Sequence, residues 1–218
     1  MKLLLTSAGL TNSKIVNALL ELTELPANKV KVAFVPTASN LIEEDKGWLI
    51  DNLIDFKKQG YESIDIVDIS AVPKESVLRR FENANVICFG GGNEIFLAEM
   101  IVKSGIADEL KELLKNRVYM GISAGSMVAG VLPSEDIIKV IYPEEVFERT
   151  TSKTLNYVNI HYIPHLNSRF FKRNRKEVIE GINEFSAPVY VCDDQTALKI
   201  INDNIEIVGG GDYLIKKI

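Results

Sequence analysis

Residues 117–126 read RVYMGISAGS, an apolar stretch that ends in a serine between two glycines. A strand, the motif G-x-S-x-G and a helix, in this order, form the nucleophile-elbow pattern, in which a sharp turn strains the central residue and exposes its side chain. Gly121 and Gly125 supply the small residues that this turn needs two positions on either side of Ser123. The pattern predicts a nucleophile at Ser123, and its structural alternative is a turn with a capping serine. Ser126 is the competing nucleophile, although a β-branched residue two positions later fits the turn less well.

Short apolar runs and longer amphipathic stretches alternate on both sides of this turn. The runs KVAFV (31–35) and VICF (86–89), for example, precede helix-like stretches at 47–60 and 93–116. Alternating strands and helices predict βαβ units in a mostly parallel sheet. Runs that are apolar at every position fit strands that are covered on both faces. We therefore expect a three-layer α/β/α fold.

The C-terminal third of the chain has a different pattern. We expect residues 154–164 to form a strand and residues 169–185 to form a basic helix. The runs VYVC, TALKII and NIEIV, with turn residues among them, predict successive antiparallel strands at one edge of the sheet. No repeat, low-complexity tract or Gly/Ser linker divides the chain, so residues 1–218 are expected to form a single domain.

Composition narrows the functional classes. The 218 residues are 46% hydrophobic and 25% charged, which is typical of a soluble globular protein, and the formal net charge is −5. This acidic balance disfavours nucleic-acid partners. The uncharged stretch 118–134 is interrupted by glycines and serines and is short for a bilayer span, so no membrane partner is expected. The N-terminus lacks a secretory pattern, and we expect a cytoplasmic protein.

Ligands of open parallel sheets bind beyond the carboxyl ends of the strands. Four stretches lie at predicted strand ends and are therefore candidate ligand-binding loops: 6–9, 36–39, 90–93 and 121–125. The stretch at 90–93 reads GGGN, and its backbone amides suit a phosphate or an oxyanion. The nucleotide-binding motifs G-x-x-x-x-G-K-[ST] and G-x-G-x-x-G are both absent. The N–H groups of Ala124 and of Gly91 or Gly92 are therefore candidate oxyanion donors.

A serine nucleophile needs a base, and the most common base is histidine. The chain has two histidines, His161 and His165. His165 follows Pro164 just beyond a predicted strand, where catalytic loops gather, so it is the preferred base. His161 lies within the strand, which is typical of a hydrogen-bonded core or surface histidine.

The third member of such a triad is a carboxylate that orients the imidazole. Asp193 and Asp194 directly follow the run VYVC, whereas Glu135 and Asp136 come soon after the elbow. Each pair has an ordinary alternative as a solvated loop acid or a helix cap. Spacing along the chain leaves open which carboxylate reaches His165.

A cationic cluster follows His165 and consists of Arg169, Lys172, Arg173, Arg175 and Lys176. Its ordinary interpretation is the solvated face of a basic helix. Beside a candidate catalytic histidine in an acidic protein, such a cluster also suits a substrate carboxylate, which arginine binds in a bidentate way. Arg175 and Arg173 are the candidate substrate-binding residues.

Cysteine and histidine spacing gives no sign of a metal site. Cys88 and Cys192 each lie within an apolar run, as small buried residues do. Neither they nor the two histidines have the spacing of metal ligands. We expect no metal and no organic cofactor.

Together these motifs resemble the peptidase E (aspartyl dipeptidase) family, whose relatives include cyanophycinase. The resemblance covers most of the chain and depends on the G-x-S-A-G turn at 121–125, the GGGN stretch at 90–93 and the pair Pro164-His165. It implies a three-layer α/β fold related to class I glutamine amidotransferases, with Ser123 where those enzymes have cysteine. It also implies a serine-type hydrolase that acts on small peptides without a cofactor.

The resemblance also assigns roles to single residues. Ser123 matches the nucleophile of the family and His165 matches its catalytic histidine. Asp194 roughly matches the glutamate that orients this histidine, although its side chain is one methylene shorter. Asp136 matches an acidic residue after the elbow and is the alternative acid.

Substrate binding follows from the same resemblance. Arg175, helped by Arg173 and by Asn93 of the GGGN stretch, is expected to bind the substrate, with Arg175 on the side chain of an N-terminal aspartate. This implies an exopeptidase for Asp-X dipeptides, and a homodimer is a further expectation. The alternatives are a non-catalytic α/β module that binds a small molecule, and an amidase or peptidase for another acidic substrate, as in cyanophycinase.

Overall fold

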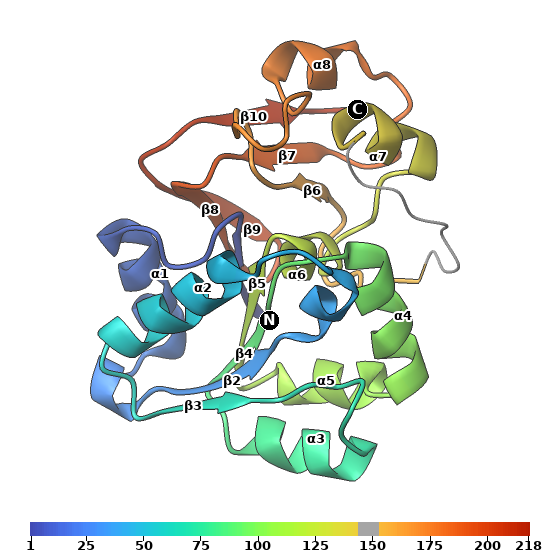
Figure 1. Cartoon of the computed structure of the whole chain (residues 1–218). Coiled ribbons are helices and arrows are strands. Elements are labelled where there is room, and N and C mark those ends of the chain that lie inside the picture. The colour runs from blue at the N-terminus through green and yellow to red at the C-terminus, as the bar shows by residue number, and fades with distance from the viewer. Residues whose placement is uncertain (144–152) are drawn as a thin grey trace.

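A seven-stranded sheet runs through the middle of the molecule, with its strands in the order β3-β2-β4-β5-β1-β8-β9. The computed structural model describes residues 1–143 and 153–218 (Figure 1). The strands are β1 (Lys2–Thr6), β2 (Lys31–Val35), β3 (Ser63–Ile66), β4 (Val86–Phe89), β5 (Val118–Ile122), β8 (Thr196–Ile201) and β9 (Asn204–Gly209). The first five pair in parallel, whereas β8 and β9 are antiparallel to their neighbours. The predicted, mostly parallel sheet is confirmed.

Helices cover both faces of this sheet (Figure 1). They are α1 (Ser13–Thr23) and α2 (Gly47–Lys58) on one face, and α3 (Lys74–Glu82), α4 (Glu94–Ser104) and α5 (Ala107–Leu113) on the other. Leu3 and Leu5 of β1 belong to one buried cluster and Leu4 to the second, as expected for a strand with two covered faces. The three-layer α/β/α fold is confirmed. The predicted helix at 93–116 is in fact two helices, because Gly105, with φ 64°, ends α4.

A second, three-stranded sheet packs at one end of the molecule in the order β10-β7-β6. Its strands are β6 (His161–Ile163), β7 (Val189–Cys192) and β10 (Tyr213–Lys216). The prediction that VYVC and TALKII are neighbours at one edge was wrong, because VYVC is β7 in the small sheet and TALKII is β8 beside β1. The carboxylate of Asp193 explains the change of sheet: it accepts the backbone N–H groups of Gln195 and Asp212, which fixes a turn directly after β7.

The predicted basic helix at 169–185 was also largely wrong. Only α8 (Lys176–Gly181) is helical, and the preceding residues form a loop. The guanidinium of Arg175 donates to the backbone carbonyls of Ser168, Phe171 and Asn174. Because the Arg175 side chain binds these carbonyls, it competes with the backbone hydrogen bonds of a helix, and the chain stays irregular up to the start of α8.

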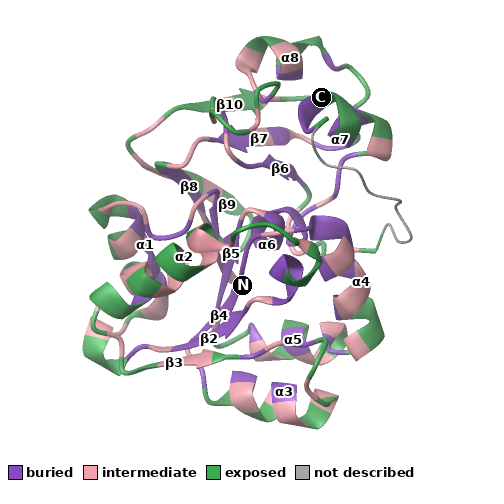
Figure 2. Cartoon of the chain, in the orientation of Figure 1, coloured by how far each residue is buried: buried purple, intermediate pink, exposed green. Residues whose placement is uncertain are grey.

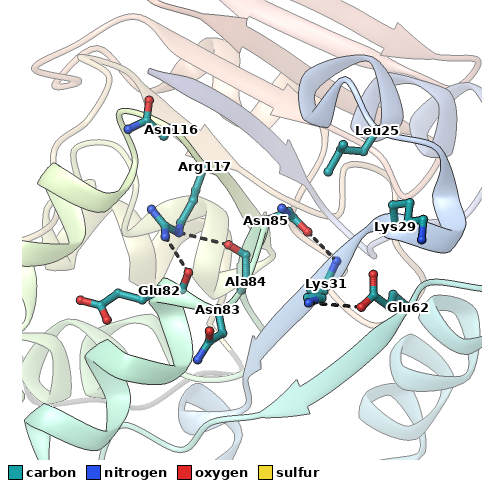
Figure 3. A pocket seen from close by; sticks show the side chains of 10 residues that line it. All are labelled: Leu25, Lys29, Lys31, Glu62, Glu82, Asn83, Ala84, Asn85, Asn116 and Arg117. Carbon is teal, nitrogen blue, oxygen red and sulfur yellow. Dashed lines mark hydrogen bonds and ion pairs between the residues drawn. The ribbon is translucent and has the colours of Figure 1, made fainter.

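Buried residues gather in the central strands, and exposed residues lie on the outer helices (Figure 2). A hollow of about 410 Å³ opens beside residues that precede β2, β3, β4 and β5, so it lies at the amino edge of the sheet (Figure 3). Three of its charged groups bind one another or the backbone: Lys31 pairs with Glu62, and Arg117 donates to the carbonyls of Glu82 and Ala84. The elbow predicted at 121–125 follows the carboxyl end of β5 and belongs to the opposite edge.

Candidate active site

Ser123 occupies a strained turn between β5 and the short helix α6 (Ala124–Met127). Its backbone has φ 49° and ψ −111°, a conformation that L residues rarely adopt. A Cβ atom on Gly121 would lie 2.6 Å from the backbone nitrogen of Ser126, and one on Gly125 would lie 2.0 Å from the carbonyl oxygen of Phe89. The turn therefore requires glycine at both positions, as the motif predicted.

Ser126, the competing nucleophile, serves the fold. It is fully buried, and its hydroxyl accepts the backbone N–H of Thr6 at 2.9 Å and donates to the carbonyl of Thr6 at 2.8 Å. Both hydrogen bonds attach the elbow helix to the end of β1. A hydroxyl engaged twice by one residue of a buried strand is not available to attack a substrate.

His165 lies between Ser123 and Asp194. Its Nε2 is 3.0 Å from Ser123 Oγ, and its Nδ1 is 2.6 Å from Asp194 Oδ1. The imidazole is shielded, with 18% of the side chain exposed, whereas 48% of the Asp194 side chain is exposed. The hydrogen bonds run from a carboxylate through an imidazole to a hydroxyl, the order in which a serine is activated by general base catalysis.

Ser7 holds the backbone of His165, and sequence reasoning gave it no role. The buried Ser7 hydroxyl accepts the His165 N–H at 3.1 Å, donates to the Cys192 carbonyl at 2.8 Å and lies 3.3 Å from the Tyr162 hydroxyl. His165 itself has φ 65°, which is unusual for a residue of this size. The stretch 6–9 was noted as a strand end, but only the fold shows which backbone group its serine meets.

Among the described residues, the carboxylate that contacts His165 is that of Asp194. Asp193 accepts the two backbone N–H groups that form the turn after β7. Glu135 pairs with Lys139 at 2.6 Å within α7 (Glu135–Ile141). Asp136 is exposed in the first turn of the same helix, and the structure gives it no hydrogen bond to His165.

The glycine loop before α4 lies against the serine. A Cβ atom on Gly91 would be 3.4 Å from Ser123 Cβ and 3.5 Å from Trp48 Cζ3, so Gly91 lies between the nucleophile candidate and an indole ring. A Cβ atom on Gly92 would instead be 2.2 Å from the carbonyl oxygen of Ala38, in the 3-10 turn η2 (Thr37–Leu41). Of the two candidate oxyanion donors, Gly91 is thus the one beside Ser123. The position of Trp48 had no signal in the sequence.

Asn93 ends this loop and caps α4. Its Oδ1 accepts the Phe96 N–H at 2.7 Å, and its own N–H donates to the Ala38 carbonyl at 2.9 Å. The side chain is almost fully buried, and its Nδ2 has no acceptor among the described residues. Asn93 therefore fixes the loop and keeps one buried donor unused.

Comparison with known proteins identifies the family. The family model for peptidase family S51 matches residues 3–208. The chain belongs to peptidase family S51. It is accordingly a serine peptidase, and the resemblance to peptidase E noted from the sequence is confirmed.

Relatives of this S51 member include proteins named peptidase E. The one from Actinobacillus pleuropneumoniae serotype 5b is 26% identical over 192 residues, which cover 84% of this chain and 77% of that protein. The one from Haemophilus influenzae strain Rd is 28% identical over 142 residues, which cover 62% of each chain.

Two solved structures share the fold. A protein assigned to peptidase E from Listeria monocytogenes EGD-e matches with a TM-score of 0.74 and 22% identity, covering 100% of this chain and 98% of that one. A peptidase from an acI-B1 Actinobacterium matches with a TM-score of 0.72 and 20% identity, covering 99% and 90%.

The two arginines predicted to bind substrate differ in this S51 member. Arg175 is half-buried, and both of its Nη atoms donate to backbone carbonyls of its own loop. Arg173 is exposed, and its Nε donates to the Val140 carbonyl at 3.2 Å. The two Nη atoms of Arg173 make no hydrogen bond within the described residues.

The remaining histidine and the cysteine near the site have structural roles in this peptidase. His161 accepts the Ser186 N–H at Nε2 and is 2.7 Å from the Val131 carbonyl at Nδ1, and burial lowers its pKa. Burial raises the pKa of the Cys192 thiol to about 12, which keeps the thiol protonated. The described residues contain no group of three or more potential metal ligands and no helix long and apolar enough to cross a bilayer.

Proposed function

We propose that this serine peptidase hydrolyses short peptides, chiefly dipeptides with an N-terminal aspartate, and that Ser123, His165 and Asp194 form its catalytic triad. The observation that supports the triad is the pair of hydrogen bonds on the His165 ring, 2.6 Å to Asp194 Oδ1 and 3.0 Å to Ser123 Oγ. Both lengths lie within the range for proton transfer between positioned groups.

Acylation uses the two nitrogens of His165. Nε2 accepts the hydroxyl proton while Ser123 Oγ forms a bond to the scissile carbonyl carbon, and Nδ1–H remains hydrogen-bonded to the Asp194 carboxylate. The electron pair of the carbonyl moves to its oxygen, which the N–H groups of Ala124 and Gly91 stabilise. When the carbonyl re-forms, the C–N bond breaks and the leaving amine takes the proton from Nε2.

Deacylation repeats these steps with water. His165 Nε2 accepts a proton from a water molecule, whose oxygen attacks the acyl carbon. The ester bond to Ser123 Oγ then breaks, the serine regains its proton from Nε2, and the carboxylic acid product leaves. In this scheme protons pass among Ser123, His165, water and the leaving amine, and no further proton donor or acceptor is needed.

The preference for an acidic substrate is supported by the charge of the loop after His165. The loop carries Arg169, Lys172, Arg173 and Arg175, in a chain with a net charge of −5. Lys176, the last cation of the cluster, begins α8 and pairs with Asp212. Within the part of the chain that the structure describes, the two Nη atoms of Arg173 make no hydrogen bond, and such a pair is what a carboxylate binds in a bidentate way. We therefore assign the aspartate side chain of the substrate to Arg173, with Arg175 as the second candidate named by the resemblance.

Covalent labelling with a fluorophosphonate, combined with peptide hydrolysis, tests the proposal. We expect one adduct per chain on the wild-type protein, and neither adduct nor turnover for Ser123→Ala. Ser104→Ala is the matched control, because among the described residues that hydroxyl bonds its own helix alone, at the Ile101 carbonyl. Asp-X peptides should be cleaved faster than Glu-X, β-aspartyl and Ala-X peptides. Hydrolysis by Ser123→Ala would refute the nucleophile, and a preference for Ala-X would refute the substrate class while the triad survived.

A further inference from the structure

The ring of Phe171 stacks on the imidazole of His165. Their centroids are 5.2 Å apart and the two planes differ by 29°. We propose that Phe171 is a positioning residue, which holds the imidazole at the tilt that brings Nε2 to Ser123, and that Arg175 holds the loop carrying Phe171. The inference depends on the proposed roles of Ser123 and His165 and assigns to Arg175 a role other than substrate binding.

The imidazole needs a contact on its face. It has one hydrogen bond at each ring nitrogen, to Asp194 and to Ser123. Two hydrogen bonds at opposite nitrogens leave the tilt of the ring about the line joining them weakly defined. The Asp194 carboxylate is half exposed, so water competes for its hydrogen bond. An aromatic ring against the face restricts this tilt, since stacked pairs have preferred geometries.

Phe171 is itself held by a buried aromatic residue. The ring of Tyr142 meets it edge-on, with centroids 5.3 Å apart and planes at 85°. The Tyr142 hydroxyl donates at 2.8 Å to the carbonyl of Pro164, the residue before His165. The contacts therefore form a closed path from the imidazole through two aromatic rings back to the peptide that carries the imidazole.

Arg175 completes this arrangement from inside the loop. Nη1 donates to the carbonyls of Phe171 at 3.1 Å and Asn174 at 2.8 Å, and Nη2 donates to the carbonyl of Ser168 at 3.0 Å. The buried Asn174 adds a hydrogen bond from Nδ2 to the Pro164 carbonyl. With three carbonyls on its two Nη atoms, Arg175 has the contacts of a loop anchor.

The aromatic face also favours the state of His165 that the reaction creates. Once Nε2 has taken the serine proton, the ring is a cation, and a cation over an aromatic face is attracted by the π-system. In the proposed mechanism this cation forms as the transition state is reached, so its stabilisation acts on the chemical step. Loss of Phe171 should therefore lower kcat and leave KM nearly unchanged.

The test compares Phe171→Ala with Phe171→Tyr on Asp-X and Ala-X peptides. We expect Phe171→Ala to lower kcat about tenfold with little change in KM, and Phe171→Tyr to keep kcat within about twofold of wild type. Phe170→Ala is the matched control, since Phe170 is the neighbouring residue, is 68% exposed and contacts Arg169. Should Phe171→Ala unfold, Phe171→Leu replaces it, with a kcat expected below that of Phe171→Tyr.

Arg175→Ala separates loop anchoring from substrate binding. We expect kcat to fall by a similar factor on Asp-X and Ala-X peptides, because the anchor acts through Phe171. A rise in KM confined to Asp-X peptides would overturn the anchoring role, and a wild-type kcat in folded Phe171→Ala would overturn the positioning role. In both cases, an inactive Ser123→Ala would leave the proposed triad intact, whereas an active one would reject the triad itself.

Discussion

The two edges of the large sheet carry different polar residues and use them differently. At the amino edge, Arg117 donates to the carbonyls of Glu82 and Ala84, and Lys31 pairs with Glu62 (Figure 3). Arg117 also donates to the carbonyls of Phe81 and Leu113. At the carboxyl edge, Ser123 and His165 both have positive φ angles, and the hydroxyl of one meets the imidazole of the other. The first edge has a hollow without a reactive group, whereas the second has a strained hydroxyl beside a base.

This contrast teaches that a hollow alone does not locate an enzyme site. Lys31, Glu62 and Arg117 line the hollow of about 410 Å³ at the amino edge, yet all three bind protein partners. Polar groups that satisfy one another stabilise a fold. Groups kept in costly conformations, with a donor such as Asn93 Nδ2 left unused, indicate a site for a ligand.

Asp194→Asn, a change at the carboxyl edge, should have the largest effect on kcat. An amide in place of the carboxylate stabilises the wrong tautomer of His165, and in serine proteases such a change lowers kcat by about 10⁴-fold. We expect a loss of about 10³-fold or more, measured by steady-state hydrolysis of an Asp-X peptide. Asp136→Asn, an exposed change on α7, should leave kcat near wild type. The reverse ranking of the two variants would transfer the orienting role to Asp136.

Arg173→Gln should produce an intermediate effect that depends on the substrate. Loss of a charged partner for the substrate carboxylate should lower kcat/KM for Asp-X peptides about 10- to 100-fold and change Ala-X hydrolysis little. Lys172→Gln removes a neighbouring exposed charge without a bidentate donor and controls for net charge. Equal losses on both peptides for Arg173→Gln would show that Arg173 does not read the acidic side chain.

Arg117→Ala, a change at the amino edge, should have the smallest effect on activity and should act on stability instead. It removes the side-chain donor of four backbone carbonyls, of which those of Phe81 and Leu113 still accept the N–H groups of Ala84 and Asn116. The free energy of unfolding should fall by about 1–3 kcal/mol, measured by urea denaturation. We expect kcat/KM at 25 °C to stay within about twofold of wild type. A large loss of turnover in the folded variant would contradict the division of roles between the two edges.

The sequence predicted those features that depend on neighbouring residues. Gly121 acts within the turn and Gly125 makes room for the Phe89 carbonyl of β4, but both stand at a fixed spacing from Ser123, so the motif was visible in the chain. The apolar runs of the parallel strands reflect burial on both faces and were visible as well. Asp193 and Asp194 are adjacent and chemically alike, and only the turn after β7 gives one to the backbone and the other to His165.

The wrong predictions have two causes, side-chain contacts within a loop and pairing between distant segments. The residues before α8 have the composition of a helix, but Arg175 binds the carbonyls of the loop. The assignment of β7 to a separate sheet depends on pairing with β10, more than 20 residues later along the chain. Contacts between distant segments, such as that of Ser7 with His165, leave no local pattern in the sequence.

The hydroxyl of Ser7 has a consequence for how the enzyme can be altered. Ser123 extends from the seven-stranded sheet, whereas His165 and Asp194 follow β6 and β7 of the smaller one. Ser7 bridges these two separately hydrogen-bonded bodies at the place where they meet. In the proposed mechanism the reaction therefore depends on the alignment of two sheets, and a substitution that slides one against the other is expected to reduce turnover without touching a reacting atom.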